Sequence, residues 1–133
     1  MTSEKITVQS LYTVTDEELM LMSSQNPELR FERNANATLE TMPPTGGISD
    51  NREIKAGAYL LNWVESQDLG EVFGPSTGFR LANTAVRAPN VAFVAKGRLP
   101  EGWDQEEDKF INLAPDFVIE IPSKNDSLAK LKA

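Results

Sequence analysis

The sequence predicts a domain of the α+β class, with short strands and three helices in irregular order along the chain. Two patterns lead to this class. Short runs of β-branched and aromatic residues, bounded by proline, glycine or asparagine, are typical of strands. Longer segments that carry apolar residues at helical spacing, behind residues that cap helices, are typical of amphipathic helices. The 133 residues are enough for one domain with one modest core, so we take 1–133 as a single domain.

The N-terminal part is expected to form a short helix followed by a β-hairpin. Thr15 and Glu18 have the spacing of a capping box, which starts a helix that ends near Ser24. Residues 29–33 alternate apolar and charged side chains, as a half-buried strand does. After a short turn, residues 38–42 return as the second arm of the hairpin.

The longest helix is predicted to begin behind the capping residues 49–51 and to end near Gln67. Its apolar stripe consists of Ile54, Ala58, Leu61 and Val64, widened by Leu60 and Trp63. We expect Trp63 to be a core residue rather than a platform for stacking bases, because large aromatic side chains usually contribute through burial.

The C-terminal half is predicted to consist mostly of strands. The expected strands are 71–73, 78–81, 87–94 and 115–122, with a solvated acidic excursion at 100–108 and a last helix that begins at Leu128. Side chains in 115–122 alternate between two faces, so Phe117, Ile119 and Ile121 share an apolar face. Glu120 lies on the opposite face, where a charge has little structural purpose.

Asn90 and Glu120 are the residues on which a functional interpretation depends. Asn90 lies at the start of the strand 87–94, and Glu120 lies near the end of the strand 115–122. If these strands are neighbours, the two side chains can meet near one point. A divalent cation such as Mg²⁺ favours oxygen ligands of this kind, although a carboxylate would be the expected ligand at position 90.

Composition excludes several kinds of function. The net charge of −7 and the pI of about 4.6 give no basic footprint for nucleic acid over the whole chain. The absence of histidine and cysteine excludes Ser-His-Asp triads, disulfides, thiolate chemistry and zinc sites that need imidazole. No apolar run reaches membrane length and no signal peptide starts the chain, so we expect a soluble cytoplasmic protein.

Five stretches of the sequence carry a resemblance to a known family. They are Arg33, Met42-Pro43-Pro44-Thr45-Gly46-Gly47, Ser76-Thr77-Gly78-Phe79, Arg87-Ala88-Pro89-Asn90-Val91-Ala92 and Pro115-Asp116-Phe117-Val118-Ile119-Glu120. In these stretches, and in the order of its elements, the chain resembles the Uma-type restriction endonuclease family, once a domain of unknown function, in the PD-(D/E)XK nuclease superfamily. The resemblance implies a restriction-endonuclease-like central mixed sheet flanked by helices, with an N-terminal β-hairpin. It also implies a hydrolase that cleaves DNA.

The family pattern implies a site in which an aspartate and a glutamate hold Mg²⁺ or Mn²⁺ beside a basic residue. On this chain the implied metal ligands become Asn90 and Glu120, and the basic position two residues after the glutamate is Pro122. Lys124 has the strand parity to replace the missing cation, although it lies beyond the proline. The implied catalytic residues are therefore Glu120, Asn90 and Lys124. We expect weak or absent metal binding, because Asn90 contributes no charge.

Three interpretations of function stay open at this point. The first is a Mg²⁺-dependent DNA endonuclease that tolerates Asn90, and the second is an inactive nuclease-like scaffold for binding or assembly. The third, which the charge of −7 favours, is a domain that binds a small ligand or a protein without any nucleic acid. Family members continue beyond the point where this chain stops. We therefore expect a C-terminally shortened domain whose Leu128 and Leu131 are covered in a homodimer.

Overall fold

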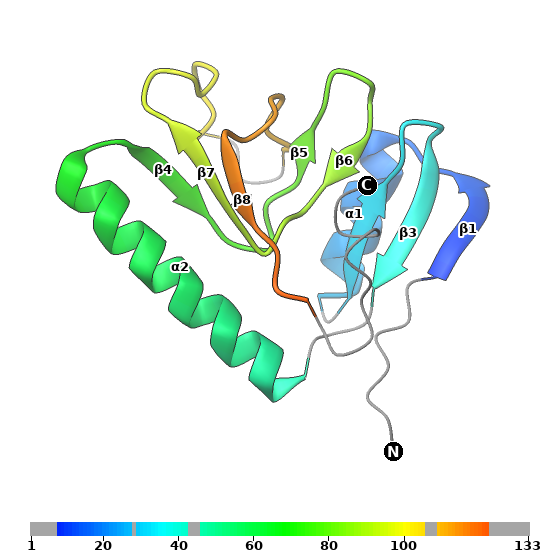
Figure 1. Cartoon of the computed structure of the whole chain (residues 1–133). Coiled ribbons are helices and arrows are strands. Elements are labelled where there is room, and N and C mark those ends of the chain that lie inside the picture. The colour runs from blue at the N-terminus through cyan, green and yellow to red at the C-terminus, as the bar shows by residue number, and fades with distance from the viewer. Residues whose placement is uncertain (1–7, 28, 43–45, 106–108, 123–133) are drawn as a thin grey trace.

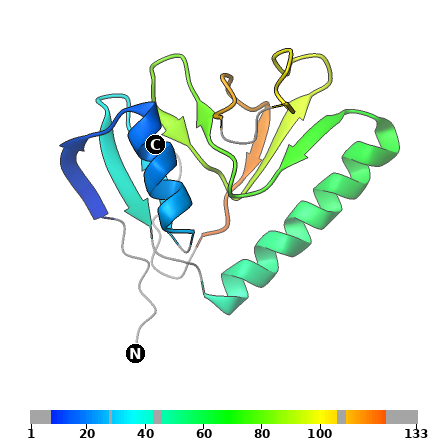
Figure 2. The ribbon, with the colours of Figure 1, turned by 180° about the vertical axis from the view of Figure 1, so that it is seen from behind.

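The structure is a computed structural model that describes residues 8–27, 29–42, 46–105 and 109–122. It confirms the α+β class, with two helices and eight strands in the described residues (Figures 1 and 2). In chain order the elements are β1 Val8–Thr13, α1 Asp16–Gln25, β2 Arg30–Arg33, β3 Thr38–Met42, α2 Gly47–Gln67, β4 Gly70–Phe73, β5 Phe79–Arg80, β6 Val86–Arg87, β7 Val91–Ala95 and β8 Phe117–Ile119. Neither described helix combines the length and the apolar composition that crossing a membrane requires. The helix expected from Leu128 lies outside the described residues.

The first sheet has five strands in the order β1-β3-β2-β6-β5, and each pair of neighbours is antiparallel. β2 and β3 form the predicted hairpin, in which Arg33 pairs with Leu39 beside the turn. β1 is an addition to that hairpin, since Val8–Thr13 pairs with β3 on the side away from β2. The N-terminal hairpin of the expected fold is therefore confirmed, and it is part of a wider sheet.

The predicted capping box is present at the start of α1. The Thr15 Oγ1 accepts the Glu18 N–H at 3.2 Å, and the Glu18 carboxylate accepts the Thr15 N–H at 3.0 Å. These two bonds satisfy donors that the first turn of a helix leaves without partners. The helix then brings Leu19, which is 1% exposed, into the core of the first sheet against Phe31 and Leu39.

The second sheet has three antiparallel strands in the order β4-β7-β8. α2 packs along it against β4 and β7 (Figure 1). Val64 is the fully buried side chain of this helix, and Gly57, earlier on the same helix, lies next to the side chain of Val91. This packing determines that the face of α2 with Gly57 and Val64 is the one that lies against the second sheet, near the start of β7.

Two predictions for the long helix are wrong. It begins at Gly47 behind an extended Gly46, so residues 49–51 lie within the first turns instead of capping it. Trp63 is 57% exposed and Ile54 is 69% exposed, although the apolar stripe predicts that both contribute to the core. The physical reason is the orientation of α2, because the face that packs on the second sheet carries Gly57, Leu60 and Val64, and Ile54 and Trp63 lie outside that face.

The strand expected at 87–94 is divided between the two sheets. β6 ends at Arg87 in the first sheet, β7 begins at Val91 in the second, and residues 88–90 connect them. Pro89 has no N–H to donate to a ladder, so pairing stops there and the chain can change direction. The described strands therefore form two sheets joined at 88–90, instead of one continuous central sheet.

A second core lies between β5, β7 and the segment around Ile111. Phe79 has no exposed surface, and its ring meets that of Phe73 edge to face at a centroid distance of 5.6 Å. Trp103 packs against Phe73 in the same way at 5.5 Å. Trp103 belongs to the excursion 100–108 that is expected to be solvated, so this part of the prediction is wrong for Trp103. Residues 106–108 lie outside the described residues.

β4 and β7 approach each other too closely at Gly70 for any other residue. Gly70 pairs with Ala95 and has a φ of 153°. A Cβ built on it would lie 2.1 Å from the carbonyl oxygen of Val94. Only glycine adopts this backbone conformation without strain and leaves that space free.

Candidate active site

The start of β7 and the end of β8 lie side by side in the second sheet. In the antiparallel ladder Val91 pairs with Ile119. Asn90 directly precedes Val91 and Glu120 directly follows Ile119, so both residues adjoin the last pair of the ladder. The Ile121 N–H donates to the Asn90 Oδ1 at 3.0 Å, which independently places Asn90 beside residues 120 and 121.

Asn90 is one of the two buried polar residues among the described part of the chain, with 2% of its surface exposed. Its Oδ1 accepts the Ile121 N–H, and its Nδ2 donates to the Glu53 carboxylate. These partners decide the orientation of the amide, because a backbone N–H can only donate and a carboxylate can only accept. Both ends of the Asn90 amide are therefore engaged by the protein.

Glu53 is a residue that the sequence analysis does not single out. It lies on the second turn of α2, and its side chain reaches across to Asn90, 37 positions later in the chain. Its position in the helix could have identified it. The face of α2 that packs against the sheet carries residues at helical spacing: Glu53, Gly57, Leu60 and Val64. A half-buried acid on the packed face of a helix needs a partner, and Asn90 is that partner.

Ala88 is held at both of its backbone polar groups by side chains from β2. The Glu32 carboxylate accepts the Ala88 N–H at 2.7 Å, and the Arg30 Nη2 donates to the Ala88 carbonyl oxygen. The alternation in 29–33 predicts an exposed charge at Glu32, but this side chain is half-buried in its contact with Ala88. The connection between the sheets is thus fixed from the first sheet at residue 88 and from α2 and the segment after β8 at residue 90.

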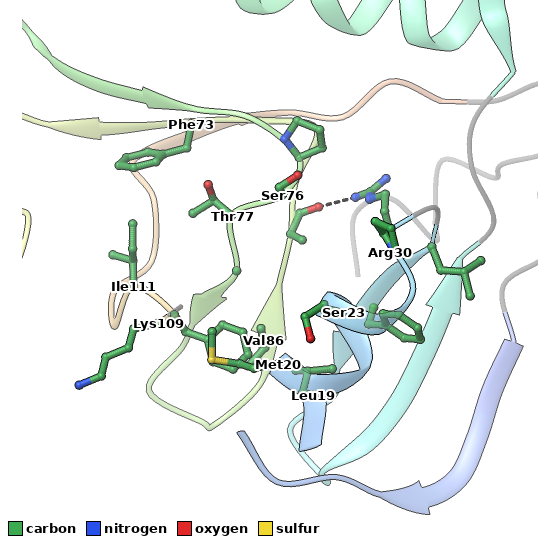
Figure 3. Close-up of a pocket in the computed structure, with 18 of the residues that line it drawn as sticks. Leu19, Met20, Ser23, Arg30, Phe73, Ser76, Thr77, Val86, Lys109 and Ile111 are labelled. Carbon is green, nitrogen blue, oxygen red and sulfur yellow. Dashed lines mark hydrogen bonds between the residues drawn. The ribbon is translucent and has the colours of Figure 1, made fainter. Parts of the chain in front are cut away.

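A pocket of about 790 Å³ opens next to this connection (Figure 3). Its walls come from α1, β2, the turn before β5 and the segment around Ile111. Arg30, Glu53 and Ala88 belong to its lining, so the pocket reaches the group of residues around Asn90. A crevice of this size beside a buried polar cluster is the kind of place where small ligands and substrates bind.

Comparison with protein families gives a clear result. A model of the Uma2 family, described as "Putative restriction endonuclease", matches residues 16–133. The chain belongs to the Uma2 family. This membership confirms the expected kinship and supports a nuclease-like function and an interaction with DNA. A search of curated proteins returned no match.

The other residues that the sequence suggested for the site of this Uma2 protein lie in different parts of the structure. Glu120 is half-buried beside Asn90, whereas Pro122 is exposed and Lys124 lies outside the described residues. Lys96, at the far end of β7, is exposed and forms an ion pair with Asp68. Arg87, by contrast, is half-buried and donates to the Arg33 carbonyl oxygen and the Asn34 side chain, each at 3.0 Å.

Asp116 is also far from Asn90, at the other end of the β7–β8 ladder. Its carboxylate accepts the Ala95 N–H and pairs with the Arg98 guanidinium, each at 2.7 Å. These two donors hold the pKa of Asp116 below its ordinary value, because they stabilise the ionised form. The contacts fasten β8 to the end of β7, so Asp116 has a structural role in this Uma2 protein.

The donors around Asn90 can be compared with the needs of a divalent metal. Among the described residues, no three acidic, histidine or cysteine side chains gather as a metal site would require. The Glu53 carboxylate contacts the Asn90 amide, and Glu120 directly precedes Ile121, whose N–H donates to the Asn90 Oδ1. Mg²⁺ commonly uses one or two carboxylates and completes its shell with water and substrate phosphate, so this set fits a weak site for a hard cation.

Proposed function

We propose that this Uma2 protein is a DNA endonuclease that hydrolyses phosphodiester bonds with a weakly held Mg²⁺ or Mn²⁺. The observation that carries the proposal is the buried amide of Asn90, which contacts the Glu53 carboxylate and the backbone next to Glu120. This contact supports a site at the position where the family pattern expects one, with Glu53 as its first acid and Glu120 proposed as its second. A DNA substrate and a chain without cysteine also support a cytoplasmic location.

Glu53, Glu120 and the amide oxygen of Asn90 would hold the cation in this proposal. A bound Mg²⁺ would offset the charge of the phosphate and make a bound water more acidic. The protein's own residues prepare the site. Asn90 orients the Glu53 carboxylate through its N–H, and the Ile121 N–H fixes the Asn90 oxygen. Glu120 would provide the charge that Asn90 lacks.

Cleavage of supercoiled plasmid tests the proposal. We expect slow nicking by the natural chain with Mg²⁺ or Mn²⁺, and a loss of roughly 100-fold in Glu120→Gln and in Glu53→Gln, because each removes charge stabilisation at the phosphate. Asn90→Asp should raise the rate by about tenfold or more, because a third carboxylate strengthens cation binding.

Glu65→Gln is the matched control, since Glu65 is an exposed acid near the other end of α2. Its activity should equal that of the natural chain. Equal nicking by the natural chain, Glu53→Gln and Glu120→Gln would contradict the proposal and indicate a contaminating nuclease. Calorimetric titration with Mn²⁺ separates weak binding from none.

A second function, a nuclease-like scaffold that binds or assembles without cleaving DNA, is supported by one specific observation. Both polar groups of the Asn90 amide already have protein partners, and Pro122 stands where the family pattern has a cation. If the protein is such a scaffold, the natural chain does not nick plasmid with either Mg²⁺ or Mn²⁺. Cleavage by Asn90→Asp alone would then attribute the loss of activity to that position.

We further propose that the chain forms a homodimer. Large apolar side chains are exposed on α2 and on β8, which is the outer described strand of the second sheet: Ile54, Tyr59, Trp63, Phe117 and Val118. Exposed apolar surface next to a strand edge favours association with another chain. Light scattering at micromolar concentration should give twice the chain mass of 14.7 kDa. Trp63→Lys should shift the population toward monomer, and a monomeric natural chain would contradict the proposal.

A further inference from the structure

Arg30 is the most poorly satisfied cation among the described residues. Its Nε and Nη1 are buried and have no hydrogen-bond partner, and only its Nη2 donates to the Ala88 carbonyl oxygen. Arginine carries five N–H donors and keeps its charge at every physiological pH. A buried guanidinium with unused donors is costly, and the cost is offset only when a charged acceptor reaches it.

The surroundings of Arg30 suit an anion with several oxygens. Arg30, Ser76 and Thr77 line the same pocket of about 790 Å³, in which the Arg30 guanidinium donates to the Ala88 carbonyl oxygen (Figure 3). Ser23 of α1 lines the same pocket. Hydroxyl groups donate to phosphate oxygens, and a guanidinium can bind two of them at once.

The acids that line the pocket do not neutralise Arg30. Asp50 and Asp104 are exposed, so water screens their charge. Glu53 is half-buried, and the described contact of its carboxylate is with Asn90. No ion pair is found for Arg30 with any of these three side chains, and its buried Nε and Nη1 have no partner among the described residues.

We propose that this pocket binds a phosphate group, with Arg30 as its cation and the hydroxyls of Ser76 and Thr77 as further donors. Arg30 holds Ala88, two residues before Asn90, so a phosphate bound here lies next to the candidate active site. Arg30 then provides the positive charge that Pro122 cannot. A phosphodiester of DNA and free phosphate share this chemistry, and the DNA source depends on the endonuclease proposal.

Thermal unfolding with inorganic phosphate tests the site. The natural chain is compared in sodium phosphate and in sodium chloride of equal ionic strength. A phosphate concentration about ten times the dissociation constant should raise Tm by about 3–5 °C, because a ligand that binds the folded state stabilises it. Arg30→Met should lose this rise. Arg52→Met, which removes an exposed cation from α2, should keep it.

Two results would overturn the site: no rise in the natural chain, or an equal rise in Arg30→Met. If Arg30→Met does not fold, Arg30→Lys replaces it. The lysine keeps the charge but loses the planar fork, so the phosphate-dependent rise should be smaller by several-fold and an undiminished rise counts against the site.

Fluorescence polarisation with a short labelled duplex identifies the source of the phosphate. Weakening of roughly tenfold in Arg30→Met, with no change in Arg52→Met, assigns the site to the DNA backbone. Phosphate binding through Arg30 without any DNA binding leaves this inference standing and contradicts the endonuclease proposal. DNA cleavage without phosphate binding at Arg30 contradicts this inference and leaves the endonuclease proposal standing, so the two can fail separately.

Discussion

Asn90→Asp is expected to destabilise the metal-free protein by about 2–4 kcal/mol at neutral pH, and Mg²⁺ or Mn²⁺ is expected to restore part of the loss. The amide of Asn90 donates to the Glu53 carboxylate, and an aspartate would replace that donor with a second negative charge. The site is 2% exposed at Asn90, so water would screen the repulsion poorly. Urea unfolding with and without the cation measures both effects.

The pH dependence gives a second signature of this variant. Repulsion between two close carboxylates is relieved when the folded protein takes up a proton that the unfolded chain does not bind at the same pH. The penalty should therefore be largest at neutral and alkaline pH and should shrink as the pH falls toward about 5. A penalty independent of pH would mean that the introduced aspartate and Glu53 do not face each other.

The double variant Glu53→Gln with Asn90→Asp is the matched control. It reverses the direction of the hydrogen bond, since the glutamine amide can donate to the aspartate, and it keeps a single negative charge. Its stability should recover most of the loss seen in Asn90→Asp, and it should show little response to Mg²⁺. A double variant as unstable as the single one would contradict the contact between positions 53 and 90.

Gly70→Ala is expected to cost at least about 3 kcal/mol or to prevent folding. An added methyl group would lie 2.1 Å from the Val94 carbonyl oxygen, and the backbone φ of 153° is unfavourable for any residue with a Cβ. The atoms that the methyl group would meet belong to the backbone of residues 94–96, so no side-chain rotation can relieve the clash. Chemical denaturation monitored by tryptophan fluorescence measures the loss.

Gly74→Ala is the control for this effect. Gly74 lies in the turn after β4, its φ is not in the left-handed region, and a Cβ there would meet no atom within 4 Å. Its stability should change by less than about 1 kcal/mol. A similar loss at positions 70 and 74 would show that the pairing of Gly70 with Ala95 is not the cause.

Local signals in the sequence were sufficient for much of the fold. The capping box at Thr15 and the alternation in 29–33 depend on neighbours within a few residues, so both predictions are confirmed. β1 could have been recognised from the β-branched and aromatic residues in 8–13. Pro89 was also visible in the sequence. The sequence alone did not show that this proline separates β6 of the first sheet from β7 of the second.

The predictions that failed depend on contacts between distant residues. Trp63 has the spacing of a core residue, but its burial depends on whether a strand lies opposite, and β4 and β7 do not cover it. Glu53 contacts Asn90 across 37 positions, and helical spacing alone could not identify that partner. The neighbourhood of Asn90 and Glu120 could be anticipated because it needed only one assumption, that β7 and β8 pair. Their catalytic roles stay predictions.

The three-residue connection at 88–90 would couple the two binding events that we propose. Its first residue, Ala88, forms hydrogen bonds with Arg30 and Glu32 of the first sheet. Its last residue, Asn90, forms hydrogen bonds with Glu53 and the Ile121 N–H. Phosphate bound at Arg30 and a cation bound near Asn90 would both contact groups that hold these peptides, so each would change the affinity for the other. Thermodynamic reciprocity then applies: whatever factor the anion imposes on the affinity for the cation, the cation imposes on the affinity for the anion.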